Sequence, residues 1–257
     1  MLRSRIIPVL LVRNHGLVKT VKFSSEKYVG DPLNAVRIFN EKEADELVII
    51  DIDATSMGNP INYNSIEHWA AECRMPLCYG GGVSSLENAI RILSLGVEKV
   101  AISSAAIRNP NIITEITHKV GRQSVVAVID VKKTLFSGYQ VYINNGKVPV
   151  KAPLLEIVGQ LQTAGAGEIM INFIDRDGTR DGYDFDLVEK VKNSIQVPLT
   201  VVGGASDLNN IKDLVSNYSP IGAGVGSSFV FKGKYRAVLI NYPNADEKKI
   251  ICGGKDN

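Results

Sequence analysis

A single carboxylate, Asp130, follows an apolar run and is the residue best placed for acid–base chemistry. Residues 125–129 are small or β-branched and apolar, which is typical of a strand buried on both faces. In parallel α/β folds, the C-terminal ends of the strands carry the catalytic groups. Burial there raises a carboxyl pKa towards neutrality, which suits a general acid or base. The alternative is a structural carboxylate that accepts backbone hydrogen bonds.

Two sets of glycine and hydroxyl residues indicate phosphate binding at two places. Glycine lets backbone N–H groups approach an anion closely, and barrels often bind phosphate after their last strands. Glycines that only form tight turns would give the same pattern, but two matched sets with hydroxyls favour phosphate. The expected ligand is elongated and anionic at both ends, with its middle over Asp130. The first set is Gly81, Gly82, Ser103 and Ser104, and the second is Asp177, Gly178, Thr179, Gly203, Gly204, Gly226, Ser227 and Ser228.

Lys19 is a further candidate for substrate contact. It belongs to residues 13–30, a polar segment expected to be a long loop, and such loops are usually functional lids or disordered. A solvated loop lysine is the alternative. Four other carboxylates end expected strands, and some of them are expected only to cap loops: Asp51, Asp53, Asp175 and Asp177.

The chain repeats itself with a period of about 120 residues, which predicts two half-barrels of four β/α units each. In this repeat, residues 5–11 align with residues 124–130, so Leu11 takes the place opposite Asp130. Where a symmetric site would carry two carboxylates, this one carries one. The matched segments are DIDAT at 51–55 with DRDGT at 175–179, GGVS at 81–84 with GGAS at 203–206, and ISS at 102–104 with GSS at 226–228.

Apolar runs alternate with helical patterns along the chain, which predicts a (β/α)8 barrel. Helices are expected to open at Asp31-Pro32, Ser84-Ser85 and Asn109-Pro110, which have the composition of helix N-termini. Eight β/α units favour a closed barrel over an open doubly wound sheet, the alternative. The strands are expected near residues 5–12, 47–52, 76–79, 98–102, 124–130, 168–174, 198–202 and 219–225.

Two other segments depart from this alternation. Residues 134–152 are predicted to form a hairpin, because alternating residues precede a turn at Asn145-Gly146. We expect one barrel domain over residues 1–243, followed by a polar C-terminal tail over residues 244–257. The tail is expected to be disordered or to bind a partner.

Composition narrows the class of protein. The chain has 257 residues, 45% of them hydrophobic, which suits one large core. A net charge of +2 gives no basic field for nucleic acid, and no apolar run approaches the ~18 residues that span a membrane. No signal-peptide pattern opens the chain, so a reduced, cytoplasmic enzyme is expected. No metal or cofactor is expected, because the cysteines lack metal-ligand spacing: Cys73, Cys78 and Cys252.

These motifs closely resemble the cyclase subunit of imidazole glycerol phosphate synthase. The resemblance is carried by RIIP at residues 5–8, Asp130, DRDGT at residues 175–179 and the two glycine sets. It implies a cytoplasmic (β/α)8 lyase of histidine biosynthesis. Such a subunit takes ammonia from a glutaminase subunit docked on the bottom of the barrel, usually as a heterodimer. It uses the ammonia on a bis-phosphorylated ribulosyl-formimino carboxamide nucleotide and releases imidazole glycerol phosphate and an aminoimidazole carboxamide ribonucleotide.

The resemblance also implies an ammonia gate. The family carries a ring of charged residues at the starts of strands. As a set with two charges of each sign, these residues would close an ion-pair ring around an ammonia inlet. Stability of the bottom face is the alternative role. The matching residues are Arg5, Glu46, Lys99 and Glu168.

Two departures separate this chain from the cyclase pattern. The family pairs an Asp on strand one with an Asp on strand five, but Leu11 stands at the first position here, and Val9 replaces a common Cys. Cyclisation needs one group to protonate and one to deprotonate, so the chain is expected to be a poor cyclase. Residues 232–243 replace the usual closing helix. These departures resemble the branch of the family that serves acetamidino-sugar formation in lipopolysaccharide biosynthesis, with a glutaminase and a sugar amidotransferase as partners.

Three functions therefore remain open. The first is an ammonia-conducting barrel in a glutamine amidotransferase complex that serves sugar amidination. The second is an authentic histidine-pathway cyclase, favoured by Asp130 and the two glycine sets. The third is a non-catalytic scaffold that activates its glutaminase.

Overall fold

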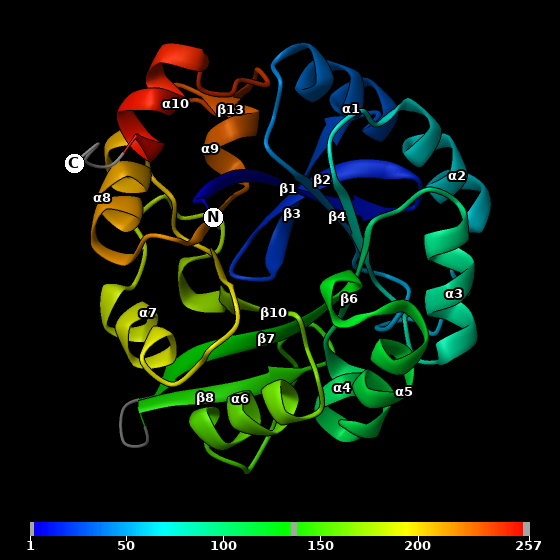
Figure 1. The fold of residues 1–257 in the computed structure, drawn as a ribbon. Coiled ribbons are helices and arrows are strands. Elements are labelled where there is room, and N and C mark those ends of the chain that lie inside the picture. Colours follow the sequence, from blue (N-terminus) through cyan, green and yellow to red (C-terminus); the bar gives the residue numbers. More distant parts are fainter. Residues whose placement is uncertain (1–2, 135–137, 254–257) are drawn as a thin grey trace.

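Eight parallel strands close into a barrel in the computed structural model, which describes residues 3–134 and 138–253. The first strand pairs with the second and the last, and the fifth pairs with the sixth to complete the ring (Figure 1). The (β/α)8 barrel is thus confirmed, and the open sheet is excluded. The strands are β1 (Arg5–Arg13), β4 (Leu47–Asp51), β5 (Leu77–Gly80), β6 (Lys99–Ile102), β7 (Val125–Thr134), β10 (Glu168–Phe173), β11 (Leu199–Val202) and β12 (Gly222–Val225).

A ring of helices surrounds the strands (Figure 1). The expected starts are confirmed: the Asp31 carboxylate accepts from the N–H of Asn34 at 2.9 Å, and the Ser85 hydroxyl accepts from the N–H of Asn88 at 3.2 Å. Pro110 precedes the third of these helices. The helices are α1 (Pro32–Glu41), α2 (Tyr63–Glu72), α3 (Leu86–Ser94), α4 (Ser104–Arg108), α5 (Asn111–Val120), η1 (Arg122–Ser124), α6 (Leu154–Thr163), η2 (Ile174–Arg176), α7 (Phe185–Lys192), α8 (Leu208–Tyr218), α9 (Ser227–Val230) and α10 (Ala245–Cys252).

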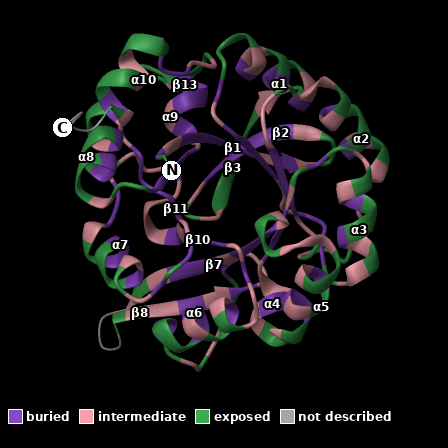
Figure 2. Ribbon diagram, viewed as in Figure 1, coloured by how far each residue is buried: buried purple, intermediate pink, exposed green. Residues whose placement is uncertain are grey.

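The buried residues form two clusters, a larger layer and a smaller group. Buried residues lie on the strands and on parts of the surrounding helices (Figure 2). The larger layer lies between the strands and the helices. The smaller cluster fills the barrel interior and is almost entirely apolar, so the barrel is a packed core below its mouth. Its buried members are Ile7, Val9, Val48, Cys78, Ala101, Val126, Met170 and Val202.

Residues 13–30 form a hairpin, so the long loop expected there is wrong. β2 (Gly16–Val21) pairs antiparallel with the end of β1, and β3 (Ser24–Gly30) pairs with β2. Asn14 and His15 both have positive φ, at 47° and 64°, as a two-residue hairpin turn requires. The residues of β3 are mostly exposed and polar, so no alternation of apolar and polar residues predicts this strand from the sequence.

The hairpin predicted over residues 134–152 is confirmed by β8 (Gly138–Ile143) and β9 (Val148–Pro149). Residues 135–137 lie outside the described residues. β8 also pairs antiparallel with β7, and this matches Asp130 with Tyr142. Each half of the barrel therefore begins with a strand that runs past the barrel rim and folds back on itself.

A helix, α10, occupies most of the segment expected to be a polar tail. It follows a short hairpin of β13 (Phe231–Lys232) and β14 (Ala237–Val238). Asn244 and Glu247 form a reciprocal capping box at its start, and Ile251 is buried as α10 packs against α8. A single buried residue leaves no apolar periodicity, so the sequence pattern does not predict this helix.

Candidate functional site

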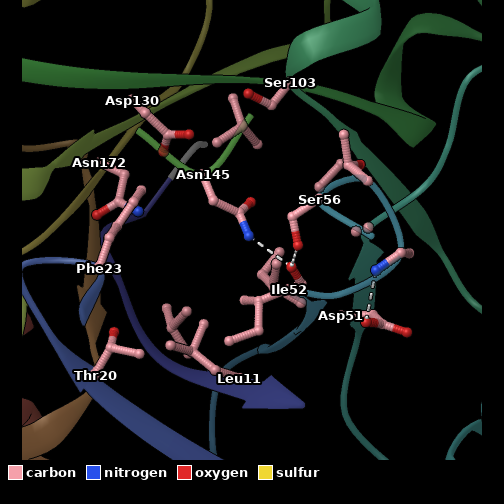
Figure 3. Close-up of a pocket in the computed structure, with 18 of the residues that line it drawn as sticks. Leu11, Thr20, Phe23, Asp51, Ile52, Ser56, Ser103, Asp130, Asn145 and Asn172 are labelled. Carbon is pink, nitrogen blue, oxygen red and sulfur yellow. Dashed lines mark hydrogen bonds between the residues drawn. The ribbon is translucent and has the colours of Figure 1, made fainter. Parts of the chain in front are cut away.

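The C-terminal ends of the strands surround a cavity of about 710 Å³. Strands and loops from both halves of the barrel line it, including the mouth-facing residues of the strands (Figure 3). This is the position at which barrels of this kind carry their active sites.

Asp130 lies in this cavity and is 8% exposed. Burial raises the pKa of its carboxyl to about 7, and the charge of Asp177 adds to the rise, while a hydrogen bond from the side chain of Asn172 opposes it. A carboxyl with that pKa exchanges a proton near neutral pH, as a general acid or base must. This position in the cavity suits an acid–base group better than a structural carboxylate that accepts backbone hydrogen bonds.

Leu11 occupies the matching place in the first half. β1 and β7 lie four strands apart in either direction around the eight-stranded ring, so Leu11 and Asp130 face each other across the mouth (Figure 3). Leu11 pairs in register with Ile50, as Asp130 pairs with Asn172. An apolar pair thus stands where the second half places a carboxyl and an amide.

Lys19 lies on β2 and is only 4% exposed, so it is no solvated loop lysine. Its ammonium donates a hydrogen bond to the carbonyl of Val9. Burial lowers the pKa of Lys19 to about 8, and the opposing charge of Asp177 limits the fall. Asp177 accepts from the Thr20 hydroxyl at 2.8 Å. The structure thus brings Lys19 and Asp177 together at one end of the cavity.

The two glycine pairs have matching backbones. Gly81, Gly82, Gly203 and Gly204 all have φ between 74° and 111°. A Cβ on Gly81 would lie 2.3 Å from the carbonyl oxygen of Asp51, and one on Gly203 would lie 2.5 Å from that of Phe173. The tight-turn explanation therefore holds for these glycines. They also line the cavity, so their turns present backbone to any ligand there.

Ser103 and Gly226 are equivalent in the structure. Ser103 precedes α4 with φ −109° and ψ −93°, and Gly226 precedes α9 with φ −102° and ψ −93°. The sequence repeat had matched Ser103 with Ser227, so the structural equivalence is shifted by one residue. Ser103, Ser104, Gly226 and Ser227 all line the cavity, at the level of the glycine turns.

Two expected ligands point elsewhere. The hydroxyl of Thr179 donates to the carbonyl of Arg176 at 3.1 Å, and that of Ser228 donates to the carbonyl of Ala205. Of the residues that the structure describes, neither belongs to the set that lines the cavity, whereas Asp177 and Gly178 do.

Arg180 is a cavity residue that sequence reasoning missed. Its guanidinium donates to the carbonyls of Ser227 at 2.9 Å and Phe231 at 2.6 Å, beside the second glycine set. Its Nε is buried without a partner among the described residues. Its position directly after the DGT sequence does not reveal these contacts, because Ser227 and Phe231 are distant in the sequence. Arg108, which also lines the cavity, is a cation near the first set.

Three carboxylates at the strand ends hold loops, and one of them, Asp51, also lines the cavity. Asp51 accepts from the N–H groups of Asp53 at 2.9 Å and Ala54 at 3.1 Å. Asp53 pairs with Arg13 at 2.8 Å, and Asp175 accepts from the N–H of Lys133 at 2.7 Å. These contacts fix the loops that border the mouth.

A closed ring of ion pairs lies at the opposite end of the barrel. Glu46 pairs with Arg5, and also with Lys99 at 2.8 Å. Glu168 pairs with Arg5 at 2.8 Å and with Lys99 at 3.0 Å, so each acid bridges both cations. Thr200 donates a further hydrogen bond to Glu168 at 2.5 Å. Burial opposes ionisation of Glu168, but Arg5 and Lys99 outweigh it and lower the pKa of this carboxyl.

Over residues 3–134 and 138–253, no group of three or more His, Cys, Asp or Glu side chains is arranged to hold a metal ion. Within those same ranges, no helix is both long enough and apolar enough to cross a membrane.

The profile of a known family, described as "Histidine biosynthesis protein", matches residues 5–236. The chain belongs to this family. A relative from Vibrio vulnificus, named "Putative imidazole glycerol phosphate synthase subunit hisF3", is 59% identical over 97% of this chain and 96% of its own length. One from Pseudomonas aeruginosa, named "Putative imidazole glycerol phosphate synthase subunit hisF2", is 49% identical over 96% of this chain and 98% of its own.

A third relative is less similar to this chain. It is named "Imidazole glycerol phosphate synthase subunit HisF", comes from Bacillus cereus, and is 38% identical over 82% of this chain and 84% of its own length. The resemblance drawn from the sequence motifs is thus confirmed at the level of the family. The names of these relatives do not mention lipopolysaccharide.

Proposed function

We propose that this chain is the synthase-type subunit of a glutamine amidotransferase complex and receives ammonia through its barrel. The observation that carries the proposal is the closed ion-pair ring below an apolar interior, with a cavity above it. Ammonia that passed the ring would meet the apolar side chains of the interior cluster. Neutral ammonia enters such a medium far more easily than ammonium, which would lose its hydration.

The partner proposed for the bottom face is a glutaminase subunit in a cytoplasmic heterodimer. The relatives named as imidazole glycerol phosphate synthase subunits support this, as does the position of the ring at the starts of the strands. The proposed ligand of the upper cavity is a small phosphorylated molecule. The paired glycine turns, with Lys19 at one end and Arg108 and Arg180 among the lining residues, support an elongated anion.

The finer assignment follows from Leu11. Ring closure in the cyclase reaction needs one group to give a proton and one to take it, and Leu11 cannot do either. We therefore place the chain in the branch that delivers ammonia for acetamidino groups on the sugars of lipopolysaccharide, with a sugar amidotransferase as a further partner. An authentic histidine-pathway cyclase is the second candidate, favoured by the raised pKa of Asp130 and the intact glycine turns.

The test reconstitutes the chain with its glutaminase and follows glutamine hydrolysis and free ammonia together. Wild-type complex should release little ammonia into the medium, and Lys99→Ala complex should release a large share of it at an unchanged hydrolysis rate. If the chain stimulates hydrolysis and Lys99→Ala leaves the path of ammonia untouched, the barrel does not conduct. The chain would then be an activating scaffold.

A further inference from the structure

Tyr242 connects the C-terminal segment to the two strands that carry half of the ring. Its hydroxyl donates to the carbonyl of Ile6 at 2.8 Å and accepts from the N–H of Asp45 at 3.1 Å. Ile6 follows Arg5 directly, and Asp45 precedes Glu46 directly. One side chain therefore touches the immediate neighbours of both members of one ion pair.

This contact lies where the backbone ladder between β1 and β4 has ended. Their pairing begins at Val9 with Val48, and the same register carried downward matches Ile6 with Asp45. At that level, side chains make the connection: the Asp45 carboxylate accepts from the N–H of Ile6 at 2.9 Å, and Tyr242 bridges the same two residues. Two side chains thus replace the backbone hydrogen bonds that would otherwise hold the strands together beside the ring.

Tyr242 is itself held firmly. It is 8% exposed, and its ring meets those of Phe39 and Phe229 edge to face, with centroids 6.3 and 5.3 Å away. Lys248 of α10 pairs with Asp45 at 3.2 Å and lies 5.5 Å from the centre of the Tyr242 ring. Burial raises the pKa of the Tyr242 hydroxyl, so it remains a donor at neutral pH.

We propose that Tyr242 is a positioning residue for the ion-pair ring. By fixing the spacing of the strand starts, its hydroxyl holds Arg5 and Glu46 at pairing distance and keeps the ring closed at rest. The C-terminal segment, and not only the barrel strands, then sets the resistance of the ring to opening. Whether an easily opened ring lets ammonia pass rests on the proposed function. The role of Tyr242 in keeping the ring closed does not.

Cys78 offers a direct reporter of ring opening. Its thiol is fully buried in the barrel interior, and its pKa is raised by burial and next by the charge of Glu46, with Lys99, Glu168 and Arg5 also close enough to act on it. Within the described part of the chain, Cys78 is not among the residues that line the upper cavity. A small thiol reagent must therefore wait for the interior to open before it reacts.

The experiment treats the full chain with methyl methanethiosulfonate at pH 8 and measures modification of the Cys78 peptide by mass spectrometry. Tyr242→Phe should raise the Cys78 rate by about tenfold, the effect of losing one or two buried hydrogen bonds from a local opening. Asp45→Ala removes the other link between the same strands and should act in the same direction. The half-buried Cys73 should keep its rate and serve as the internal standard, whereas Cys252 is not used, because Asp45 and Lys248 act on its thiol.

Tyr183→Phe is the matched control. Its hydroxyl is also buried and donates to the carbonyl of Gly224 at 3.1 Å, at the far end of β12 from the ring. A purely structural role for Tyr242 predicts equal increases in the two variants once their free energies of unfolding are matched in urea. Equal increases, or an unchanged Cys78 rate in Tyr242→Phe, overturn the inference.

The same preparations separate this inference from the proposed function. If Tyr242→Phe speeds Cys78 modification and also raises free ammonia in the glutaminase complex, both ideas are supported. If it speeds modification and ammonia delivery stays intact even in Lys99→Ala, Tyr242 still positions the ring, and conduction through the ring is wrong.

Discussion

The two halves of this barrel share a backbone and differ in their chemistry. Each half begins with a strand that folds back as a hairpin, and each has a glycine turn with positive φ and a helix start with similar dihedral angles. At the mouth, the first half presents Leu11 beside Ile50, and the second presents Asp130 beside Asn172. The two halves therefore share the glycine turns at the mouth, but only the second half has a carboxyl at this position of its first strand.

The bottom of the barrel shows the reverse asymmetry. The register that matches Ile50 with Asn172 also matches Glu46 with Glu168. Both cations of the ring, Arg5 and Lys99, come from the first half. In the second half, Gly222 takes the place of Lys99, and a Cβ there would lie 2.0 Å from the hydroxyl of Thr200. The half that has Leu11 at the mouth thus supplies both cations of the ring.

A second carboxylate at the mouth, opposite Asp130, should have the largest effect on cyclase turnover. Leu11→Asp should raise turnover of the bis-phosphorylated cyclase substrate with ammonium by about a hundredfold from a low base, because positioned acid–base groups contribute on that scale. Leu11→Asn, which has a similar shape and no acid, should give no gain. Adding Asp130→Asn to Leu11→Asp should return turnover to the base level. No gain with Leu11→Asp would mean that other pocket changes matter more.

Breaking the ring should cost stability. Lys99→Ala leaves two buried acids with one cation, and loss of one partner from a buried pair costs roughly 3–5 kcal/mol. The side chain of Lys99 is 17% exposed, so water offsets part of the cost, and we expect about 2–3 kcal/mol in urea unfolding. The exposed Lys212→Ala is the control and should stay within about 0.5 kcal/mol. Equal losses of unfolding free energy in the two variants would show that the ring does not stabilise the fold.

The free energy of unfolding should depend on pH through Asp130 in the second half, but not through Leu11 at the matching position in the first half. The pKa of Asp130 is raised in the folded chain to about 7, so its proton stabilises the fold at low pH, and that contribution is lost as pH rises towards 7. Relative to wild type, Asp130→Asn should therefore gain on the order of 2 kcal/mol between pH 5 and 7. Leu11→Asn should show no such trend. A flat difference for Asp130→Asn would place its pKa near the ordinary value.

The sequence revealed the features that repeat or continue over several residues. Apolar runs located all eight barrel strands, and the matched glycine sets located both turns at the mouth. The alignment of Leu11 with Asp130 predicted the facing pair, because side chains alternate between the two faces of a strand and aligned residues therefore point to the same side.

The features that were missed leave no repeating pattern in the sequence, or depend on contacts between residues far apart in the chain. β3 is exposed and polar, α10 buries one residue, and the shift from Ser227 to Gly226 appears only in backbone angles. Arg180 reaches the cavity through hydrogen bonds to Ser227 and Phe231, about 50 residues away, and no local pattern carries that information.

The most direct test of whether Leu11 prevents the cyclase reaction needs only the purified chain. It is given the bis-phosphorylated cyclase substrate with excess ammonium salt at alkaline pH, and both binding and substrate loss are measured. We expect binding with turnover far below ordinary enzymatic rates, since Leu11, which cannot transfer a proton, faces Asp130 across the mouth. Turnover with kcat on the order of 1 s⁻¹ or more would contradict it and establish the histidine-pathway cyclase instead.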